Sequence, residues 1–376
     1  MAELRRSYAA AGVDVAAGEQ AVDLIRGVVE STRRPESIGG LGGFAGAIGL
    51  PPGLRDPVLI AATDGVGTKT AIASALGRFD TIGRDLVAMC VDDVVCSGAE
   101  PLAFVDYVAV GRIEPAGVAE LVGGIAAGCI EAGCALVGGE TAEHPGVMDP
   151  RSFDLAGACV GVVERGRLLD GTAARPGDAI VGLAASGLHA NGYSLVRALI
   201  TEWGLDLATP YQAQLRRTLG DEATDAALAA EPEHALATLG DVLLTPTRIY
   251  ARPILRLRDA LAAAGHEIRG IAHITGGGLR ANVPRALPDG VGARLDPSRW
   301  MVPSIMTLFA ALGGLGDDEL RATFNGGLGM VVIVSPAAVK STIDRLAGEG
   351  VPAWEVGRVV AMGDVDHVRY VEGPLE

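Results

Sequence analysis

The chain has 376 residues and carries 31 Lys and Arg against 46 Asp and Glu, a net charge of −15. The length suggests two domains. The acidic balance argues against nucleic-acid binding, which needs basic residues to neutralise backbone phosphates. Small phosphorylated ligands remain compatible, because they need only a local positive patch, backbone N–H groups or a metal ion.

Membrane insertion and secretion are not indicated. Hydrophobic residues make up 49% of the sequence, enough for sizeable cores, but we find no uninterrupted apolar run of about 18 residues. The N-terminus lacks the apolar core of a signal peptide. Five cysteines contain no CxxC pair. We therefore expect small buried thiols in a reducing cytoplasm, and no membrane partner.

Helices and strands are predicted in alternation along the first half of the chain. A helix is expected within the first thirty residues, followed by a glycine-rich loop over 38–53. Next come a strand at 58–62, a helix at 85–96, a strand at 103–110, a helix at 115–132, and strands at 135–137 and 155–163. Residues 164–177 contain proline, glycine and charge and predict a linker.

The second half of the chain is also predicted to contain both helices and strands. In order, the patterns predict a strand at 178–183, a helix at 192–203, solvated helix and loop at 206–240, a helix at 246–264, strands at 270–273 and 330–334, a helix at 336–346 and a strand at 354–360. The element order predicts an α/β (α+β) fold of two domains, over residues 1–170 and 171–376.

The sequence contains partial matches to two known phosphate-binding motifs, the dinucleotide-binding motif and the P-loop, but neither match is complete. Gly40 to Ala45 matches the degenerate GxGxxA pattern, but a dinucleotide fold needs a strand directly before it, and none is predicted there. Gly67 to Thr70 resembles the end of a P-loop, but Lys69 does not directly follow the glycine.

The segment from Thr63 to Thr70 is more distinctive, because it directly follows a predicted strand. Such a turn suits a metal-bound polyphosphate: a carboxylate holds Mg²⁺ while N–H groups and an ammonium meet the oxygens. The alternative is an ordinary turn with a capping carboxylate and a solvated lysine. The residues concerned are Asp64, Gly65, Gly67, Thr68 and Lys69.

Further carboxylates favour the metal hypothesis. Asp92 and Asp93 follow an apolar helical run, and a buried charge is costly unless it is paired or bound to a cation. Glu140, with Thr141 after it, follows a predicted strand and two glycines. Asp64, Asp93 and Glu140 together predict a divalent-metal and nucleotide site; three unrelated salt bridges are the alternative.

The second half offers two candidate substrate segments. Ser186 to Gly192 lies between a strand and a helix, where small polar residues make an anion-binding position. His189 and Asn191 could orient a substrate there, and His189 could move a proton or serve only as a helix cap. The second candidate is a phosphate cradle formed by Thr275, Gly276, Gly277 and Gly278.

As a set, these motifs resemble the phosphoribosylformylglycinamidine cyclo-ligase family, also called aminoimidazole ribonucleotide synthetase. The segments that carry the resemblance are SYAAAGVDVAAGE, TRRPESIGGLGGFAG, TDGVGTKT, DTIGRDLVAMCVDD, GAEPLAFVDY, LVGGETAEHPG, AGACVGVVE, SGLHANGYSLVR, LLTPTRIY, HITGGGLRANVPR and TFNGGLGM. They occur in the family's order and leave out mainly residues 206–240.

The resemblance implies that formylglycinamidine ribonucleotide and ATP give aminoimidazole ribonucleotide, ADP and phosphate. It implies a homodimer whose N-terminal domains share a barrel, with a C-terminal α/β sandwich-like domain. Mg²⁺ would be held by Asp64, Asp93 and Glu140, with Lys69 stabilising the transferring phosphoryl group. His189 and Asn191 would orient the amide or relay a proton. A mobile loop over the nucleotide would contain Gly40, Gly42 and Gly43.

Four positions depart from the family's usual pattern: Asp92 replaces Asn, Ala190 replaces Ser, His144 replaces Met, and Arg26 replaces a lysine of some members. Two alternative functions are kept. One is another ATP-dependent phosphotransferase of the same superfamily, such as selenophosphate synthetase or thiamine-monophosphate kinase. The other is a non-catalytic scaffold in a purine-pathway assembly, although a scaffold has no reason to retain costly buried charges.

Overall fold

The computed structural model describes residues 13–365 and 367–375. Residues 7–12 of the SYAAAGVDVAAGE segment therefore lie outside the described residues. The N-terminal half contains α1 (Val15–Glu30), β1 (Ser37–Ile38), β2 (Ala47–Ile48), β3 (Pro57–Gly65), α2 (Thr70–Leu76), α3 (Ile82–Cys96), β4 (Glu100–Val110), α4 (Pro115–Ala132), β5 (Ala135–Glu143) and β6 (Phe153–Glu164).

The C-terminal half is built around a second sheet. Its elements are β7 (Ala179–Ala184), α5 (Tyr193–Glu202), α6 (Tyr211–Leu219), α7 (Asp221–Ala230), α8 (Leu239–Leu243), α9 (Ala251–Ala263), β8 (Ile268–His273), α10 (Gly278–Asn282), β9 (Val291–Leu295), α11 (Ser304–Gly313), α12 (Asp317–Thr323), β10 (Leu328–Val334), α13 (Val339–Gly348), β11 (Ala353–Ala361) and β12 (Tyr370–Glu372). The structure thus confirms the mixed α/β character predicted from the sequence.

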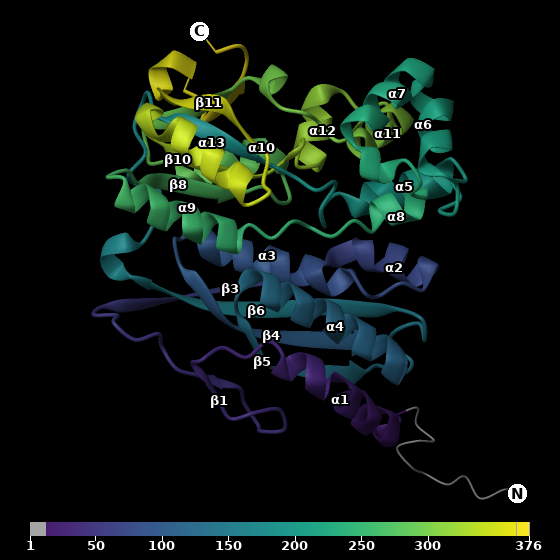
Figure 1. Ribbon diagram of the computed structural model, residues 1–376. Helices are drawn as coiled ribbons and strands as arrows, with labels where there is room; N and C mark the ends of the chain where they lie inside the picture. The colour runs from purple at the N-terminus through teal and green to yellow at the C-terminus, as the bar shows by residue number, and fades with distance from the viewer. Residues whose placement is uncertain (1–12, 366, 376) are drawn as a thin grey trace, which may run out of the picture.

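The N-terminal sheet has four strands in the order β3-β6-β4-β5, with only the β4–β5 pair parallel. α4 makes the crossover between these parallel strands and packs against α3, and both helices lie over the same face of the sheet (Figure 1). The other face is open and carries apolar side chains: Leu59 is 60%, Val105 39% and Tyr107 40% exposed. An apolar sheet face of this kind marks an interaction surface.

Glycine allows α3 and α4 to approach closely. A Cβ added to Gly83 would lie 2.3 Å from the backbone nitrogen of Ile125, and one added to Gly124 would lie 2.7 Å from the carbonyl oxygen of Asp80. α4 itself begins with Pro115 in its first turn and ends at Gly133, whose φ is 87°. Both ends follow the usual preference for proline at the start and glycine after the end of a helix.

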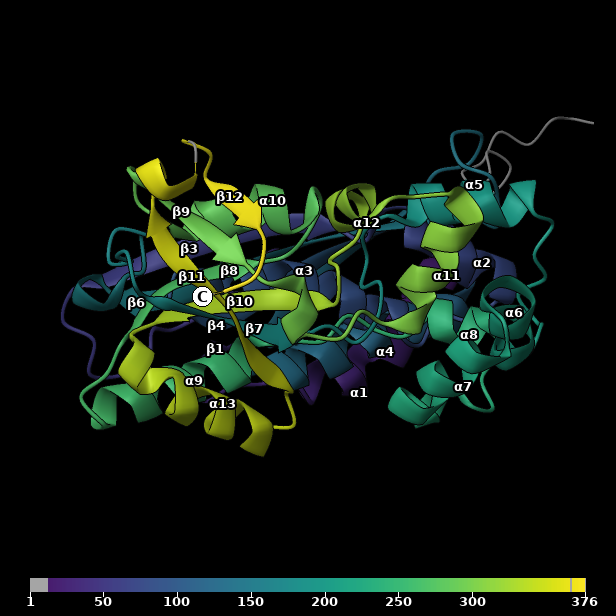
Figure 2. The same ribbon diagram turned by 90° about the horizontal axis from the view of Figure 1, so that it is seen from above.

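The C-terminal sheet has six strands in the order β12-β9-β11-β7-β10-β8. Every residue of β7 and β10 is buried, which explains why both strands are continuous apolar runs in the sequence. α9 and α13 lie side by side along this sheet, while α5, α6, α7, α8 and α11 gather at one end (Figure 2).

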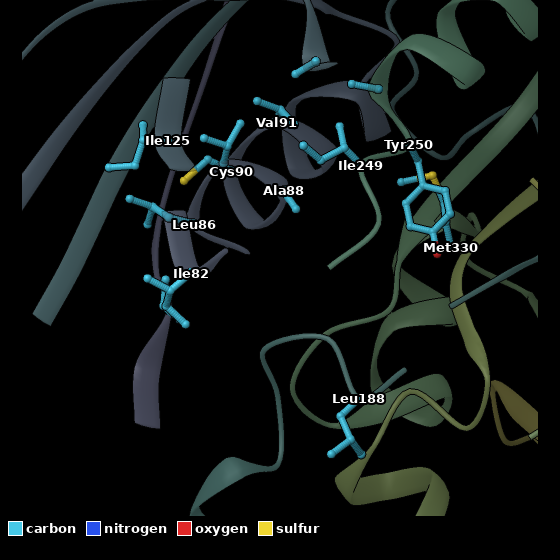
Figure 3. Packing of buried hydrophobic residues seen from close by; sticks show 14 of the residues in the cluster. Ile82, Leu86, Ala88, Cys90, Val91, Ile125, Leu188, Ile249, Tyr250 and Met330 are labelled. Carbon is cyan, nitrogen blue, oxygen red and sulfur yellow. The ribbon is translucent and has the colours of Figure 1, made fainter. Parts of the chain in front are cut away.

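α3 lies between the two halves. It contacts β3, β6 and α4 on one side and β8 and α9 on the other. Its side chains Leu86 and Cys90 belong to the same buried cluster as Tyr250 and Met330 of the C-terminal half (Figure 3). One hydrophobic core therefore continues through α3 from one half into the other.

Three sequence-based predictions need correction. The expected strand at 135–137 extends to Glu143, so Gly139 lies inside a strand, where the side chain of Asp106 lies over it and a Cβ would be only 1.7 Å from the carboxylate oxygen. The expected helix at 246–264 begins at Ala251. Residues 206–240 are not merely solvated, since Tyr211 and Leu239 have no exposed surface.

α4 is long and apolar enough by composition to cross a membrane, but half of it is buried in the fold. It packs against α1 and α3, as a core helix of a globular protein does. The patterns in the sequence missed α2, α10, α11, α12, β9 and β12, and also the short strands β1 and β2 in the predicted glycine-rich loop.

We predict that Gly124→Ala lowers the melting temperature, because the methyl group would meet the carbonyl of Asp80. Gly123→Ala is the matched control: it has no atom within 4 Å of an added Cβ, and alanine in place of a helical glycine stabilises by up to about 1 kcal/mol. Thermal unfolding of the two variants checks this. Equal effects would contradict the close approach of α3 and α4.

Asp106 generates a prediction about pH. Burial raises the pKa of this carboxyl to about 7, above its value in the unfolded chain, so its contribution to stability is lost as pH rises through about 7. At pH 8 we expect the free energy of unfolding of Asp106→Asn, measured with urea, to exceed that of the wild type by up to about 4 kcal/mol, with the difference shrinking toward pH 5. Asp318→Asn, at an exposed position on α12, serves as control. A difference independent of pH would contradict the prediction.

Candidate active site

A carboxylate and an imidazole meet where the two halves touch. Asp93 lies near the end of α3, and His273 is the last residue of β8. Nδ1 of His273 lies 2.9 Å from Oδ1 of Asp93. Because a carboxylate only accepts, His273 donates this hydrogen bond, and the sequence analysis did not identify the pair.

Asp64 lies near this pair, at the end of β3. Burial raises its pKa, the hydrogen bond from the N–H of Gly65 lowers it, and the neighbouring charge of Asp93 raises it. Asp64 and Asp93, two of the three predicted metal ligands, therefore lie near enough for the charge of Asp93 to raise the pKa of Asp64. A bound cation would relieve this repulsion between the two carboxylates.

A cavity of about 380 Å³ opens beside Asp93 and His273. Asn282 and Arg285 line its C-terminal side, and Arg285 donates a hydrogen bond of 3.1 Å to the side chain of Asn282. Within the described residues, Arg285 forms no ion pair with a carboxylate. The cavity thus has the carboxylate of Asp93 on one side and, on the other, a guanidinium that is hydrogen-bonded to Asn282.

Asn282 also shapes the glycine-rich turn after β8. Its side-chain nitrogen donates to the carbonyl oxygens of Thr275, Gly276 and Gly278 at 3.3, 3.2 and 2.9 Å. Gly276 and Gly277 are exposed. Asn282 therefore binds the carbonyl groups of the turn on its inner side, while its outer side is accessible to a ligand.

The two predicted substrate segments lie next to each other. A Cβ added to Gly276 would lie 3.7 Å from the side-chain oxygen of Asn191. The N–H of Ser186 donates to Nε2 of His189 at 3.1 Å, and the hydroxyl of Ser186 donates to the carbonyl of Pro246 at 2.7 Å. The loop is thus tied both to itself and to the segment that precedes α9.

His189 is buried, with 2% of its surface exposed. Burial lowers its pKa well below the usual value, and the nearby charges of His273, Lys69 and Arg248 lower it further. The ring is therefore neutral, and its contact with the N–H of Ser186 makes it part of the loop's internal structure. The structure brings Asn191, rather than the imidazole of His189, next to the glycine-rich turn.

Lys69 does not lie where the sequence analysis expected a phosphate contact. Its side chain is fully buried, and Nζ donates to Asp85 at 2.9 Å and to the carbonyl oxygens of Thr245 and His189 at 2.7 and 3.2 Å. Burial lowers the pKa of this lysine, while the charge of Asp85 opposes the shift. Lys69 thus connects the turn after β3 with two segments of the C-terminal half.

Glu140 is not part of the Asp64–Asp93 cluster within one chain. It is exposed on β5, paired with Tyr107 of β4, and β5 is three strands from β3, roughly 14 Å at the usual strand spacing. Thr141 follows it on the same strand. Among the described residues, no group of three or more His, Cys, Asp or Glu side chains is placed to hold a metal ion.

The glycine-rich loop is also distant from the cluster in the single chain. Gly40, Gly42 and Gly43 lie between the short paired strands β1 and β2. This hairpin covers a small cavity beside the first residues of β5, at the opposite edge of the sheet from β3. Figure 1 shows it below the four-stranded sheet, on the side away from the C-terminal half.

Four site residues escaped the sequence analysis: Asp85, His273, Asn282 and Arg285. All four lie in segments that carried the family resemblance, DTIGRDLVAMCVDD and HITGGGLRANVPR. A histidine at a strand end, followed by glycines, asparagine and arginine, is the signal that could have identified three of them. No local pattern could have shown that Asp85 meets Lys69.

Comparison with known proteins covers both halves. Residues 52–163 match the family "AIR synthase related protein, N-terminal domain" and residues 175–369 match "AIR synthase related protein, C-terminal domain". A relative from Gloeobacter violaceus, named phosphoribosylformylglycinamidine cyclo-ligase, is 51% identical over 95% of this chain and 98% of its own length. Its namesake from Sorangium cellulosum is 47% identical over 96% and 97%.

Solved structures show the same fold at low identity. Thiamine-monophosphate kinase from Stenotrophomonas maltophilia K279a superposes with a TM-score of 0.61 at 18% identity, covering 94% of this chain and 95% of its own. Hydrogenase maturation protein HypE in complex with ATP superposes with a TM-score of 0.63 at 18% identity, covering 96% and 91%.

Proposed function

We infer the reaction of this chain from its family: the chain belongs to the phosphoribosylformylglycinamidine cyclo-ligases. It is an ATP-dependent ligase of purine biosynthesis that closes the ring of aminoimidazole ribonucleotide. The observation that carries this conclusion is the 51% identity over 95% of the chain to a relative of that name. Neither a different phosphotransferase nor a scaffold finds support in the relatives of high identity.

The chemistry explains why ATP is needed. An amide oxygen is a poor leaving group, so ATP first transfers its γ-phosphoryl group to the formyl oxygen and leaves as ADP. An amidine nitrogen then attacks the activated carbon and forms the ring C–N bond, and phosphate departs with the former amide oxygen. The nitrogen loses its proton in this step. Positioning and electrostatic stabilisation supply most of the acceleration of such phosphoryl transfers.

We propose that Asp64 and Asp93 hold Mg²⁺ beside the ATP phosphates. Their donor set fits, because carboxylate oxygens are the ligands that Mg²⁺ prefers, and the charge of Asp93 acts on Asp64. When bound, the ion neutralises charge on the transferring phosphoryl group. His273 orients Asp93 through its 2.9 Å hydrogen bond, in the way that partners of metal ligands fix a carboxylate.

The substrate is proposed to lie against the C-terminal side. The exposed residues Gly276 and Gly277 of the turn offer N–H groups, and Arg285 provides a positive charge at the cavity. Asn191, next to Gly276, is placed to orient the amide. Ser186 and His189 shape the loop that carries Asn191. The cavity beside Asp93 thus allows the ribonucleotide and ATP to meet between the two halves.

We also propose a homodimer through the open face of the N-terminal sheet, as the family resemblance implies. The exposed apolar side chains of β3 and β4 support it. Glu140, Thr141 and the loop with Gly40, Gly42 and Gly43 are proposed to take part in nucleotide binding only in that assembly.

We propose that the boundary between the two domains lies at residues 170 and 171. We also propose that the protein works in a reducing cytoplasm, which its five free cysteines support.

The function is tested with formylglycinamidine ribonucleotide, ATP and Mg²⁺. The wild type should release aminoimidazole ribonucleotide and ADP one to one. Asp64→Asn and Asp93→Asn should each reduce kcat by about 100-fold or more, because each removes a charged oxygen ligand, while circular dichroism stays unchanged. Asp344→Asn, which breaks an exposed ion pair on α13, is the control. Near-normal turnover of both site variants would refute the metal assignment, and ADP without the imidazole product would point to another acceptor.

Arg285 gives a second test. Loss of a hydrogen bond to a charged group costs roughly 1.5–3 kcal/mol, so Arg285→Ala should raise the KM for the ribonucleotide by about 10- to 100-fold. The KM for ATP should change little. Arg280→Ala removes a neighbouring exposed arginine of α10 that does not line the cavity and should leave both constants unchanged. A rise confined to the KM for ATP would assign Arg285 to the nucleotide phosphates instead.

A further inference from the structure

One buried ammonium joins the two sides of the candidate site. Lys69 follows Asp64 by five positions, in the turn after β3. Its Nζ crosses to the C-terminal half, where the carbonyl of Thr245 accepts at 2.7 Å and the carbonyl of His189 at 3.2 Å. The remaining contact is to Asp85 of α3 at 2.9 Å. The turn that carries a proposed metal ligand is therefore linked directly to the loop that carries Asn191.

These three contacts use the whole donor capacity of the side chain. An ammonium has three N–H groups, and the three acceptors are one carboxylate and two carbonyls. Lys69 also has no exposed surface. In this arrangement no proton of Nζ is left for a phosphate oxygen, and no ligand can reach it.

Asp85 makes the link rigid. Its Oδ1 accepts from Lys69 and also from the backbone N–H and hydroxyl of Thr247, at 2.8 and 2.6 Å. Both charged side chains have no exposed surface. A buried ion pair is stable only when further hydrogen bonds support it; Oδ1 of Asp85 receives them from Thr247, while Oδ2 has no partner among the described residues. The segment around Thr247 is therefore linked to the pair.

The loop on the other side needs such support. His189 has a φ of 62°, a left-handed conformation that costs a non-glycine residue free energy and persists only where its surroundings determine it. Two contacts determine it here: Lys69 holds its carbonyl, and the N–H of Ser186 binds its ring. Asn191 follows two residues later, next to the glycine-rich turn.

We propose that Lys69, held by Asp85, is a positioning residue that sets the substrate loop from Ser186 to Asn191 against the turn carrying Asp64. It acts through the backbone carbonyl of His189 and is not a phosphate ligand. The proposal rests on the proposed function, since it explains how the metal-binding side and the substrate side keep a common geometry. A displacement of about 1 Å at reacting groups can cost about 100-fold in rate.

The test compares Lys69→Met with the double variant Lys69→Met/Asp85→Asn. The single variant leaves a buried carboxylate without its cation and should melt on the order of 10 °C lower. The double variant has no uncompensated charge and should regain most of this loss. In both variants kcat/KM for the ribonucleotide should stay reduced by about 100-fold, because neither provides a donor for the His189 carbonyl. The Kd of a non-hydrolysable ATP analogue with Mg²⁺ should stay within about twofold.

Arg78→Met is the matched control, because it breaks another ion pair between the two halves, to Asp241, at a half-buried position. It should change neither kcat/KM nor analogue binding. The proposal is overturned if the double variant regains activity together with stability, which would make the pair merely structural. It is also overturned if Lys69→Met weakens analogue binding by tenfold or more with an unchanged KM for the ribonucleotide. Full activity of Lys69→Met would overturn it as well.

Failure of the proposed function gives a different result. If the wild type itself releases no aminoimidazole ribonucleotide, the reaction assignment fails. The melting temperatures and analogue affinities of the same variants still show whether Lys69 belongs to the interdomain link or to the nucleotide phosphates. Intact wild-type turnover with unchanged kinetics in both lysine variants would refute only the positioning role.

Discussion

Two buried carboxylates of α3 hold the halves of this protein together. Asp85 accepts from Lys69 and Thr247, and Asp92 accepts the N–H of Tyr250 at 2.9 Å, directly before α9. A buried carboxylate without partners is costly, and these contacts hold the segment from Thr247 to Tyr250 against α3. The same constraint fixes where α9 begins, and β8 follows α9 along the chain. His273, at the end of β8, thereby meets Asp93.

Charge is distributed in the site in a way that suits the reaction. Asp64 and Asp93, the proposed cation ligands, lie on the N-terminal side, whereas Arg285 lies across the cavity from Asp93 with no carboxylate partner among the described residues. Lys69, the charge that looked most suitable for phosphate binding, is enclosed between the halves. Lys69 thus maintains the geometry between the halves, whereas Asp93 and Arg285 face the cavity. An ammonium whose three N–H groups are already hydrogen-bonded has none left to bind a substrate.

Glycines illustrate how two roles look alike in a sequence. Gly276 and Gly277 are exposed in a turn braced by Asn282, and such a turn can receive a phosphate. Gly139 and Gly124 instead allow a side chain or a backbone to approach. The glycines of the turn can thus serve ligand binding, whereas Gly139 and Gly124 serve only packing. Spacing in the sequence cannot distinguish them, since both require the absence of a Cβ.

The sequence by itself determined the class of fold, most elements with strong periodicity, and the family, because these follow from local patterns and contiguous motifs. It also predicted site roles for Asp64, Asp93, Asn191 and the turn after β8. Only the tertiary structure decided which of these residues meet: it joined Asp93 to His273 and separated Glu140 by three strands. It also enclosed Lys69 with Asp85. Contacts between residues far apart in the chain depend on sheet order and interdomain packing, and no local pattern encodes them.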